Sequence, residues 1–163
     1  MTLKHGTLAG HALAALKAQG IDIPVKPTYE IPRLPVELTD LGDEALMELY
    51  SKLTAYADFI AVQVSCAIID ERQFEKKVQG AEQASLNSYS SGGKGETRVT
   101  YARAQTALDP EIIALKADLD IAYAYRKLIE AMAGNVERDT FLVSRELTRR
   151  TSGIAGRRTG WTP

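Results

Sequence analysis

Basic side chains recur along one side of a segment near the carboxyl end of the chain. If this segment is a helix, which turns by about 100° per residue, Lys127, Arg138, Arg145 and Arg149 fall in one narrow stripe, and Arg150 adds to it. The planar guanidinium group of arginine can donate two hydrogen bonds to a phosphate. The stripe therefore predicts an anion-binding surface, whereas a solvated helix face is the alternative for any isolated helix.

Aromatic side chains accompany these cations. Phe141 projects to one flank of the stripe, and Arg157 and Arg158 form a second basic–aromatic group with Trp161. Proteins that bind single-stranded nucleic acid combine cations with aromatic platforms on which bases stack. The alternatives are that Phe141 packs in the core or at a subunit contact, and that Trp161 docks on the protein surface. The predicted nucleic-acid contacts are Lys127, Arg138, Phe141, Arg145, Arg149, Arg150, Arg157 and Arg158.

The charge of the chain is unevenly distributed. From Arg138 to the end, six arginines oppose Asp139 and Glu146, which gives +4, so the preceding residues carry −5 of the net charge of −1. This asymmetry favours an anionic partner for the basic end. The arginines of one chain are nevertheless a weak footprint for nucleic acid. Because phosphate contacts add, DNA binding would depend on a homo-oligomer that repeats the stripe, for example as a ring.

Residues for catalysis or metal binding are sparse. His5 and His11 are the only histidines, and Cys66, the only cysteine, is far from both in sequence. These residues give neither a nucleophile–base set nor the spacing of metal ligands. The glycine-rich segment 92–95 lacks the spacing of a phosphate-binding loop and follows no strand. We therefore expect no catalysis, no metal and no cofactor.

The cellular location follows from weaker signals. One cysteine excludes an internal disulfide, which fits a reducing compartment. No stretch approaches the roughly 18 apolar residues of a membrane span. We expect a cytoplasmic protein, in the host cell if it is phage-encoded, with no membrane partner.

A long helix must position the basic stripe. Asp109 and Pro110 form an N-cap followed by proline at the first helical position, and the next proline is the last residue. A helix of about 40 residues, from Asp109 to Arg150, is therefore predicted. Asp118 and Arg126 fall within its apolar arc. Buried charges need partners, and the alternative is that the two residues lie where a subunit boundary or the arm crosses the helix. The arc consists of Leu115, Ile121, Ala122, Tyr125, Ile129, Met132, Ala133, Val136, Val143 and Leu147.

Two further elements precede this helix. Residues 7–19 predict a short helix that Gly20 ends. Prolines at 24, 27, 32 and 35 predict an extended arm over residues 21–38. The arm is too apolar for a free linker, so we expect it to lie along its own helices or along a neighbouring subunit.

A second long helix is expected from a cap at Thr39 or Asp40 to about Ala84. Its apolar residues form a heptad-like seam, for which an ordinary amphipathic core helix is the alternative. Residues 71–77 are expected to be solvated and salt-bridged. The seam consists of Leu46, Leu49, Leu53, Tyr56, Ile60, Val64 and Ala67, and continues more sparsely with Phe74 and Val78.

The remaining segments complete the predicted architecture. Residues 86–96 predict a flexible loop, residues 97–108 a short helix or an extended lead-in, and residues 151–163 an irregular tail. The predicted fold is all-α: a long antiparallel helical hairpin with a short N-terminal helix and a Pro-rich arm, assembled as an oligomer. Residues 1–38 and 39–163 would form the arm region and the hairpin of a single domain.

The order of elements resembles the recombination mediator family of T-even and related phages, mainly over residues 109–153. The sequence Asp-Pro-Glu-Ile at 109–112 is similar to the start of the last helix in some members, and Arg-Arg-Thr-Ser-Gly at 149–153 to its ending. Members of that type carry an aromatic residue where Arg150 stands. The resemblance implies a ring-forming homo-oligomer that binds single-stranded DNA, a recombinase and a single-strand-binding protein, without catalysis of its own.

Two functions therefore remain open. In the first, the chain is a single-stranded DNA-binding protein that helps to load a recombinase. In the second, it is a structural or assembly protein, such as a virion or scaffold-like component, whose arm and basic tail bind neighbouring subunits.

Overall fold

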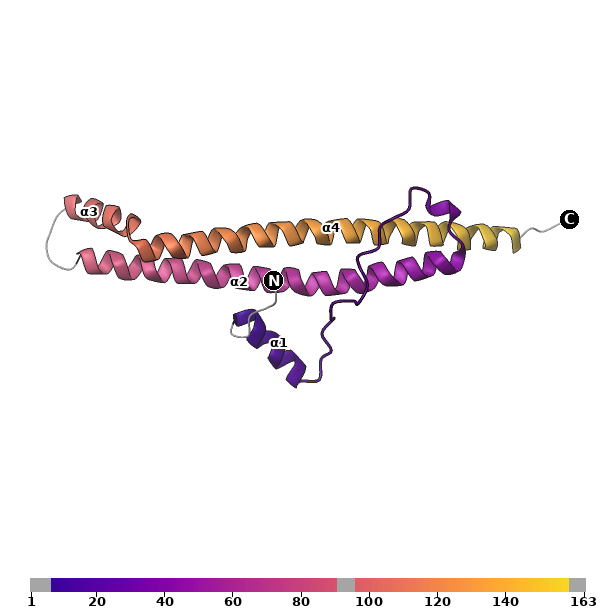
Figure 1. Ribbon diagram of the computed structural model, residues 1–163, viewed down its shortest axis with the longest axis horizontal. Helices are drawn as coiled ribbons and strands as arrows, with labels where there is room; N and C mark the ends of the chain where they lie inside the picture. Colours follow the sequence, from indigo (N-terminus) through magenta and orange to yellow (C-terminus); the bar gives the residue numbers. More distant parts are fainter. Residues whose placement is uncertain (1–6, 91–95, 159–163) are drawn as a thin grey trace. The chain divides into compact units, whose positions relative to one another are not determined.

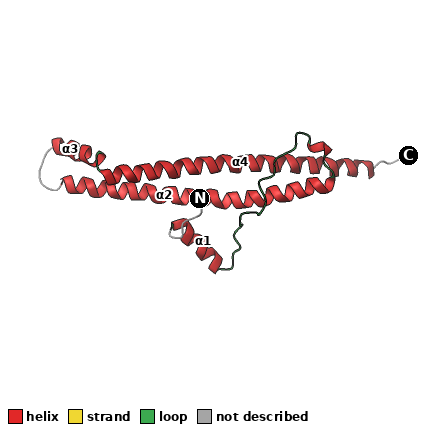
Figure 2. Cartoon of the chain, in the orientation of Figure 1, coloured by secondary structure: helices red, strands yellow, loops and turns green. Residues whose placement is uncertain are grey.

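The structure of the protein, a computed structural model, is built from helices and the segments that connect them (Figure 1). It describes the backbone of residues 7–90 and 96–158, and the side chains of residues 7–89 and 99–152. No strand occurs in these ranges, which confirms the predicted all-α class (Figure 2). The elements are α1 (Leu8–Ala18), the 3-10 turn η1 (Leu38–Asp40), α2 (Asp43–Ser90), α3 (Glu96–Ala107) and α4 (Pro110–Arg158).

The chain forms two compact units. The first unit comprises residues 1–21 and 64–128, and the second comprises residues 22–63 and 129–163. Helices α2 and α4 each contribute one part to either unit, and the two parts lie alongside each other within a unit (Figure 1).

In the first unit, α2 and α4 pack through residues spaced alternately three and four apart, the spacing that coiled coils use. The pairing is antiparallel, because the later α2 residue Glu82 meets the earlier α4 residue Lys116 at 2.7 Å, while Glu71 meets Arg126. All packed positions are buried or half-buried: Val64, Ala67, Glu71, Phe74, Val78, Ala81 and Ser85 on α2, and Ile112, Leu115, Leu119, Ala122 and Arg126 on α4.

The same spacing continues in the second unit. Leu46, Leu53 and Val143 are completely buried there, and each buried side chain of this size stabilises the fold by about 1.5–3 kcal/mol. The packed residues are Leu46, Tyr50, Leu53, Ala57 and Ile60 on α2, and Ile129, Ala133, Val136, Thr140, Val143, Leu147 and Arg150 on α4. The buried residues of α4 therefore lie on one side of the helix, and its other sides are exposed.

Helix α1 lies within one residue of its predicted bounds, 7–19, at both ends. The Thr7 hydroxyl caps it by accepting a hydrogen bond of 3.1 Å from the Gly10 amide. Gly20 follows with a φ of +77°, a conformation that favours glycine. The Leu8 amide donates to Gln73 Oε1 of α2 at 3.2 Å, and Ala9 is completely buried. The short helix thus docks on α2 within the first unit.

The segment between α1 and η1 contains neither helix nor strand. Its Tyr29 ring meets the Tyr56 ring of α2 edge-on, with 5.5 Å between the ring centres. The Tyr56 hydroxyl donates to the Tyr29 carbonyl, and the Tyr29 hydroxyl donates to the Lys52 carbonyl at 3.4 Å. At Tyr29, this segment therefore lies along a helix of its own chain.

The start of α2 differs from the prediction. Thr39 and Asp40 do not cap it, because they belong to η1. The helix begins after Gly42, whose carbonyl accepts the first helical hydrogen bond from the Leu46 amide at 2.9 Å. The helix also continues to Ser90 rather than ending near Ala84, so only residues 91–95 of the predicted loop remain, and these lie outside the described residues.

Helix α4 begins as predicted but extends further. The Asp109 carboxylate accepts from the Glu111 amide at 3.0 Å, which is the expected N-cap bond. The helix continues to Arg158 through residues assigned to an irregular tail. A glycine in a helix costs only about 1 kcal/mol relative to alanine, and no proline intervenes, so the glycines do not end it. Of the two alternatives for residues 97–108, the helical one is correct.

Several side chains also differ from the prediction. Glu71 is buried rather than solvated, and its carboxylate pairs with Arg126. Of the two charged residues whose burial the sequence leaves open, Asp118 is exposed and Arg126 is half-buried. Ile121 and Met132 are 61% and 47% exposed. The apolar arc of α4 is therefore narrower than the sequence projection indicates.

The expectation that no stretch approaches a membrane span is wrong for α2, which is long and apolar enough to cross a membrane by length and composition alone. A helix whose apolar side packs in a protein core meets the same criterion.

Candidate nucleic-acid interface

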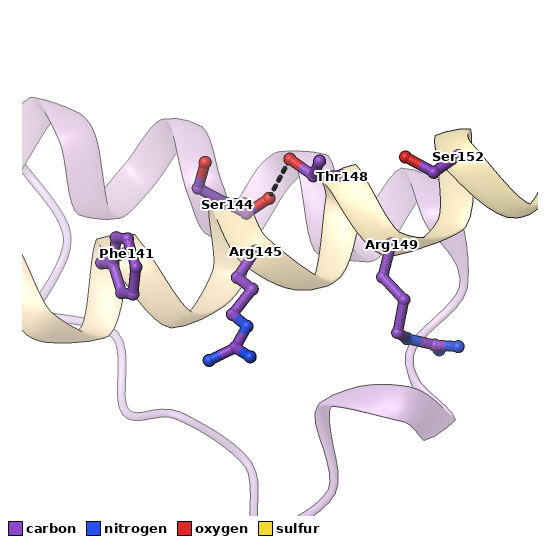
Figure 3. Close-up of a pocket in the computed structure, with 6 residues that line it drawn as sticks. All are labelled: Phe141, Ser144, Arg145, Thr148, Arg149 and Ser152. Carbon is purple, nitrogen blue, oxygen red and sulfur yellow. Dashed lines mark hydrogen bonds between the residues drawn. The ribbon is translucent and has the colours of Figure 1, made fainter.

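Two parallel rows of side chains line a shallow, open groove on α4 in the second unit. Phe141, Arg145 and Arg149 form one row and point to the same side of the helix (Figure 3). Residues four apart lie one above the other on a helix, about 6 Å along its axis. The second row has the same spacing and consists of Ser144, Thr148 and Ser152.

Phe141 is exposed. Its side chain is 64% accessible to solvent, so of the alternatives for this residue, packing in the core of its own chain is wrong. The core-facing positions in this turn of α4 are instead Thr140 and Val143. Stacking on a base and contact with another subunit both remain open to this ring.

Arg145 is the one cation of the groove for which the described part of the chain shows no acidic partner. Its side chain is exposed and lies one helical turn beyond Phe141. Arg145 therefore presents an uncompensated charge beside an exposed aromatic ring.

Arg149 is partly neutralised. Its Nε and Nη2 atoms each lie 2.7 Å from a carboxylate oxygen of Glu146, yet its side chain is 64% exposed. The hydrogen bonds from Arg149 and then from Arg150 lower the pKa of Glu146 from 4.5 to about 2. The carboxylate is ionised at neutral pH, and its hydrogen bonds hold the Arg149 guanidinium beside the groove.

Arg150 does not belong to the exposed stripe. Its side chain is 17% exposed, and its guanidinium donates to the carbonyls of Leu38, Thr39 and Leu41 at 3.2, 3.1 and 2.8 Å. It also pairs with Asp43 at 2.7 Å and Glu146 at 2.8 Å. These contacts use its donors to hold the η1 turn against α4, so phosphate binding by this residue would require the turn to detach.

The other predicted contacts do not line the groove. Arg138 is exposed on α4 and pairs with its neighbour Asp139 at 3.1 Å. Lys127 belongs to the first unit, where its ammonium lies 5.8 Å from the centre of the Tyr123 ring. Arg157 and Arg158 have helical backbones in α4, but their side chains and the whole of Trp161 lie outside the described residues.

The hydroxyl row was not predicted from the sequence. Ser144, Thr148 and Ser152 repeat the four-residue spacing of the aromatic–arginine row three positions further on, and this repeat could have identified them. The Thr148 hydroxyl donates to the Ser144 carbonyl at 2.9 Å, shown by the dashed line in Figure 3. The hydroxyl oxygens make this edge of the groove polar.

The groove is lined by groups that can hold an anion and stack on a planar ring. Its described side chains supply guanidinium groups, hydroxyls and one aromatic ring, and hence neither a general base nor a thiol. No group of three or more His, Cys, Asp or Glu side chains that could hold a metal occurs among the described residues. No protein family, curated protein or solved structure matches the chain.

Proposed function

We propose that the chain is a non-catalytic, homo-oligomeric protein that binds single-stranded DNA. The observation that carries this proposal is the exposed Phe141 ring in line with Arg145 and Arg149. A base can stack on the ring while the guanidinium groups hold the phosphates of the adjoining nucleotides. Duplex DNA would not fit this arrangement as well, because its bases are already stacked.

One chain provides few cations for this task. Glu146 compensates much of the Arg149 charge, and Arg150 is occupied by the η1 turn. Affinity therefore comes from several chains whose grooves contact one strand, since phosphate contacts add. The resemblance to phage recombination mediators supports this reading, and in that case a recombinase and a single-strand-binding protein are the further partners.

A titration of labelled oligo-dT, followed by fluorescence anisotropy at two salt concentrations, tests the proposal. Phe141→Ala should weaken binding by about 1–3 kcal/mol, or about 5- to 150-fold. Arg145→Glu should weaken it and lower the salt dependence, by about 0.7 in the logarithmic slope for each phosphate that the variant no longer binds. Arg103→Glu makes the same charge change at an exposed position on α3 and serves as the matched control.

The outcomes are distinct. Binding that the two groove variants weaken and the control does not supports the proposal. Failure of the wild-type protein to bind oligo-dT at low salt, or equal effects of Arg145→Glu and Arg103→Glu, contradicts it.

An assembly protein is the second candidate, favoured by the exposure of two valines. Val25 and Val36 of the segment before α2 are 81% and 101% exposed, which would suit contact with a neighbouring subunit or virion component. If this candidate is correct, Val25→Asp with Val36→Asp should reduce the mass of the assembly in light scattering. An unchanged mass would argue against it.

A further inference from the structure

Helix α4 carries a second apolar face in the first unit. Ala114, Ala117, Ile121, Ala124 and Leu128 are all exposed, and Ile121 and Leu128 are 61% and 68% accessible. Their spacing again alternates between three and four residues. Each lies two residues beyond a packed position of the same helix, which is about 200° around its axis. This outer face therefore points away from the packing with α2.

We infer that this outer face binds the outer face of α4 from a second copy of the chain, with the two helices antiparallel. The inference deepens the proposed function, because it rests on the homo-oligomer and names its interface. It does not depend on the DNA groove, which lies in the other unit.

The sizes of the apolar residues favour the antiparallel arrangement. When a helix pairs with its own copy about a two-fold axis near residues 122 and 123, Ile121 of one copy faces Ala124 of the other. In the same register Leu128 faces Ala117. Each large side chain thus meets a small one, which lets the helices approach closely, whereas a parallel in-register pair would oppose two isoleucines and two leucines.

The charges at the edge of the face agree with this register. Asp120 and Lys127 each immediately precede a large residue of the face, so they lie along the same edge. In an antiparallel pair of identical helices, the edge that carries Asp120 and Lys127 lies against the same edge of the partner helix. Asp120 of each copy then lies beside Lys127 of the other, and the two-fold axis produces this opposite-charge contact twice.

Charge reversal tests the interface in the full chain by light scattering. Asp120→Lys should place like charges opposite each other and reduce the oligomer mass, and so should Lys127→Asp. The double variant Asp120→Lys with Lys127→Asp should restore the mass, because the pairs are re-formed with exchanged signs. Val99→Glu, at a 49% exposed position on α3, is the control for a change of surface charge.

Cysteine cross-linking tests the register without relying on stability. In a Cys66→Ala background, a mixture of Ile121→Cys and Ala124→Cys chains should form a disulfide on mild oxidation, since facing residues bring their Cα atoms within about 7 Å. Each variant alone should cross-link poorly, whereas parallel pairing would cross-link each with itself. Circular dichroism confirms that the variants remain helical.

The results separate this inference from the proposed function. The interface is overturned if Asp120→Lys leaves the oligomer mass unchanged and the mixture of Ile121→Cys and Ala124→Cys chains does not cross-link. This holds even if the wild-type protein binds oligo-dT. A restored mass in the double variant supports the interface, even if oligo-dT is not bound.

Discussion

Arg126 of α4 and Glu71 of α2 form an ion pair inside the apolar packing of the first unit. The side chains are only 17% and 12% exposed, and Arg126 donates to both carboxylate oxygens, with Nη2 at 3.2 Å from Oε1. The pair occupies positions that the heptad spacing otherwise gives to apolar residues. A buried polar pair of this kind fixes which residues oppose each other, because any shift of one helix would separate the two charges.

Removing one partner of this pair should be far more damaging than removing both. Arg126→Leu leaves the Glu71 carboxylate buried and unpaired, so we expect a loss of about 3–5 kcal/mol in the free energy of unfolding. Arg126→Leu with Glu71→Leu should recover most of that loss, since apolar side chains can replace a buried pair at little cost. Urea unfolding followed by circular dichroism measures both. Equal losses in the single and double variants would show that the pair does not act as a unit.

The sequence correctly predicts the features that depend on residues close together along the chain. The cap of α4 by Asp109, the end of α1 at Gly20 and the packed face of α2 all follow from residues within a few positions of each other. Arg150 shows the limit of such reasoning. A helical projection places it next to Arg149, but its partners Leu38, Thr39 and Leu41 are more than 100 residues away. A helical projection of the sequence gives the direction in which a side chain points, but not which distant segment of the chain contacts it.

The exposure of Phe141 could not be predicted for a related reason. The buried face of α4 is narrow because, among the described residues of the second unit, α2 is the one α-helix beside it and η1 meets it only near Arg150. The width of a buried face depends on the number of neighbouring elements. Of the contacts predicted on α4 in this unit, Phe141, Arg145 and Arg149 line the groove, whereas Arg138 and Arg150 do not.

Arg150 should act as a structural anchor for η1. Arg150→Ala leaves three carbonyls of residues 38–41 and the Asp43 carboxylate without its donors, so we expect a lower urea midpoint and faster hydrogen exchange in this turn. Arg149→Ala is the matched control, because its side chain is mostly exposed and exposed ion pairs contribute little. If both variants shift the midpoint equally, the contacts of Arg150 with η1 do not stabilise the fold.

The stability of the second unit should fall in acid through Glu146. The pKa of this carboxyl is lowered from 4.5 to about 2, first by its hydrogen bond with Arg149 and then by that with Arg150. A lowered folded-state pKa means that the stabilisation is fully present above about pH 4.5 and is lost as the pH falls towards 2. Urea midpoints measured from pH 6 to pH 2 should therefore decline less for Glu146→Gln than for the wild-type protein. If the urea midpoints of the variant and the wild-type protein fell equally, carboxyl groups other than Glu146 would be responsible for the acid sensitivity.

Tyr56 should hold the segment before η1 against α2. Its ring is 4% exposed and meets Tyr29 edge-on, and its hydroxyl donates to the Tyr29 carbonyl. Tyr56→Phe keeps the ring contact and removes only the hydrogen bond, so we expect a loss of about 1 kcal/mol in the free energy of unfolding. Tyr29→Ala removes the ring contact as well, and should increase proteolysis of residues 21–37 while α2 remains helical. Protease resistance that survives Tyr29→Ala would show that other contacts, such as a neighbouring subunit, secure this segment.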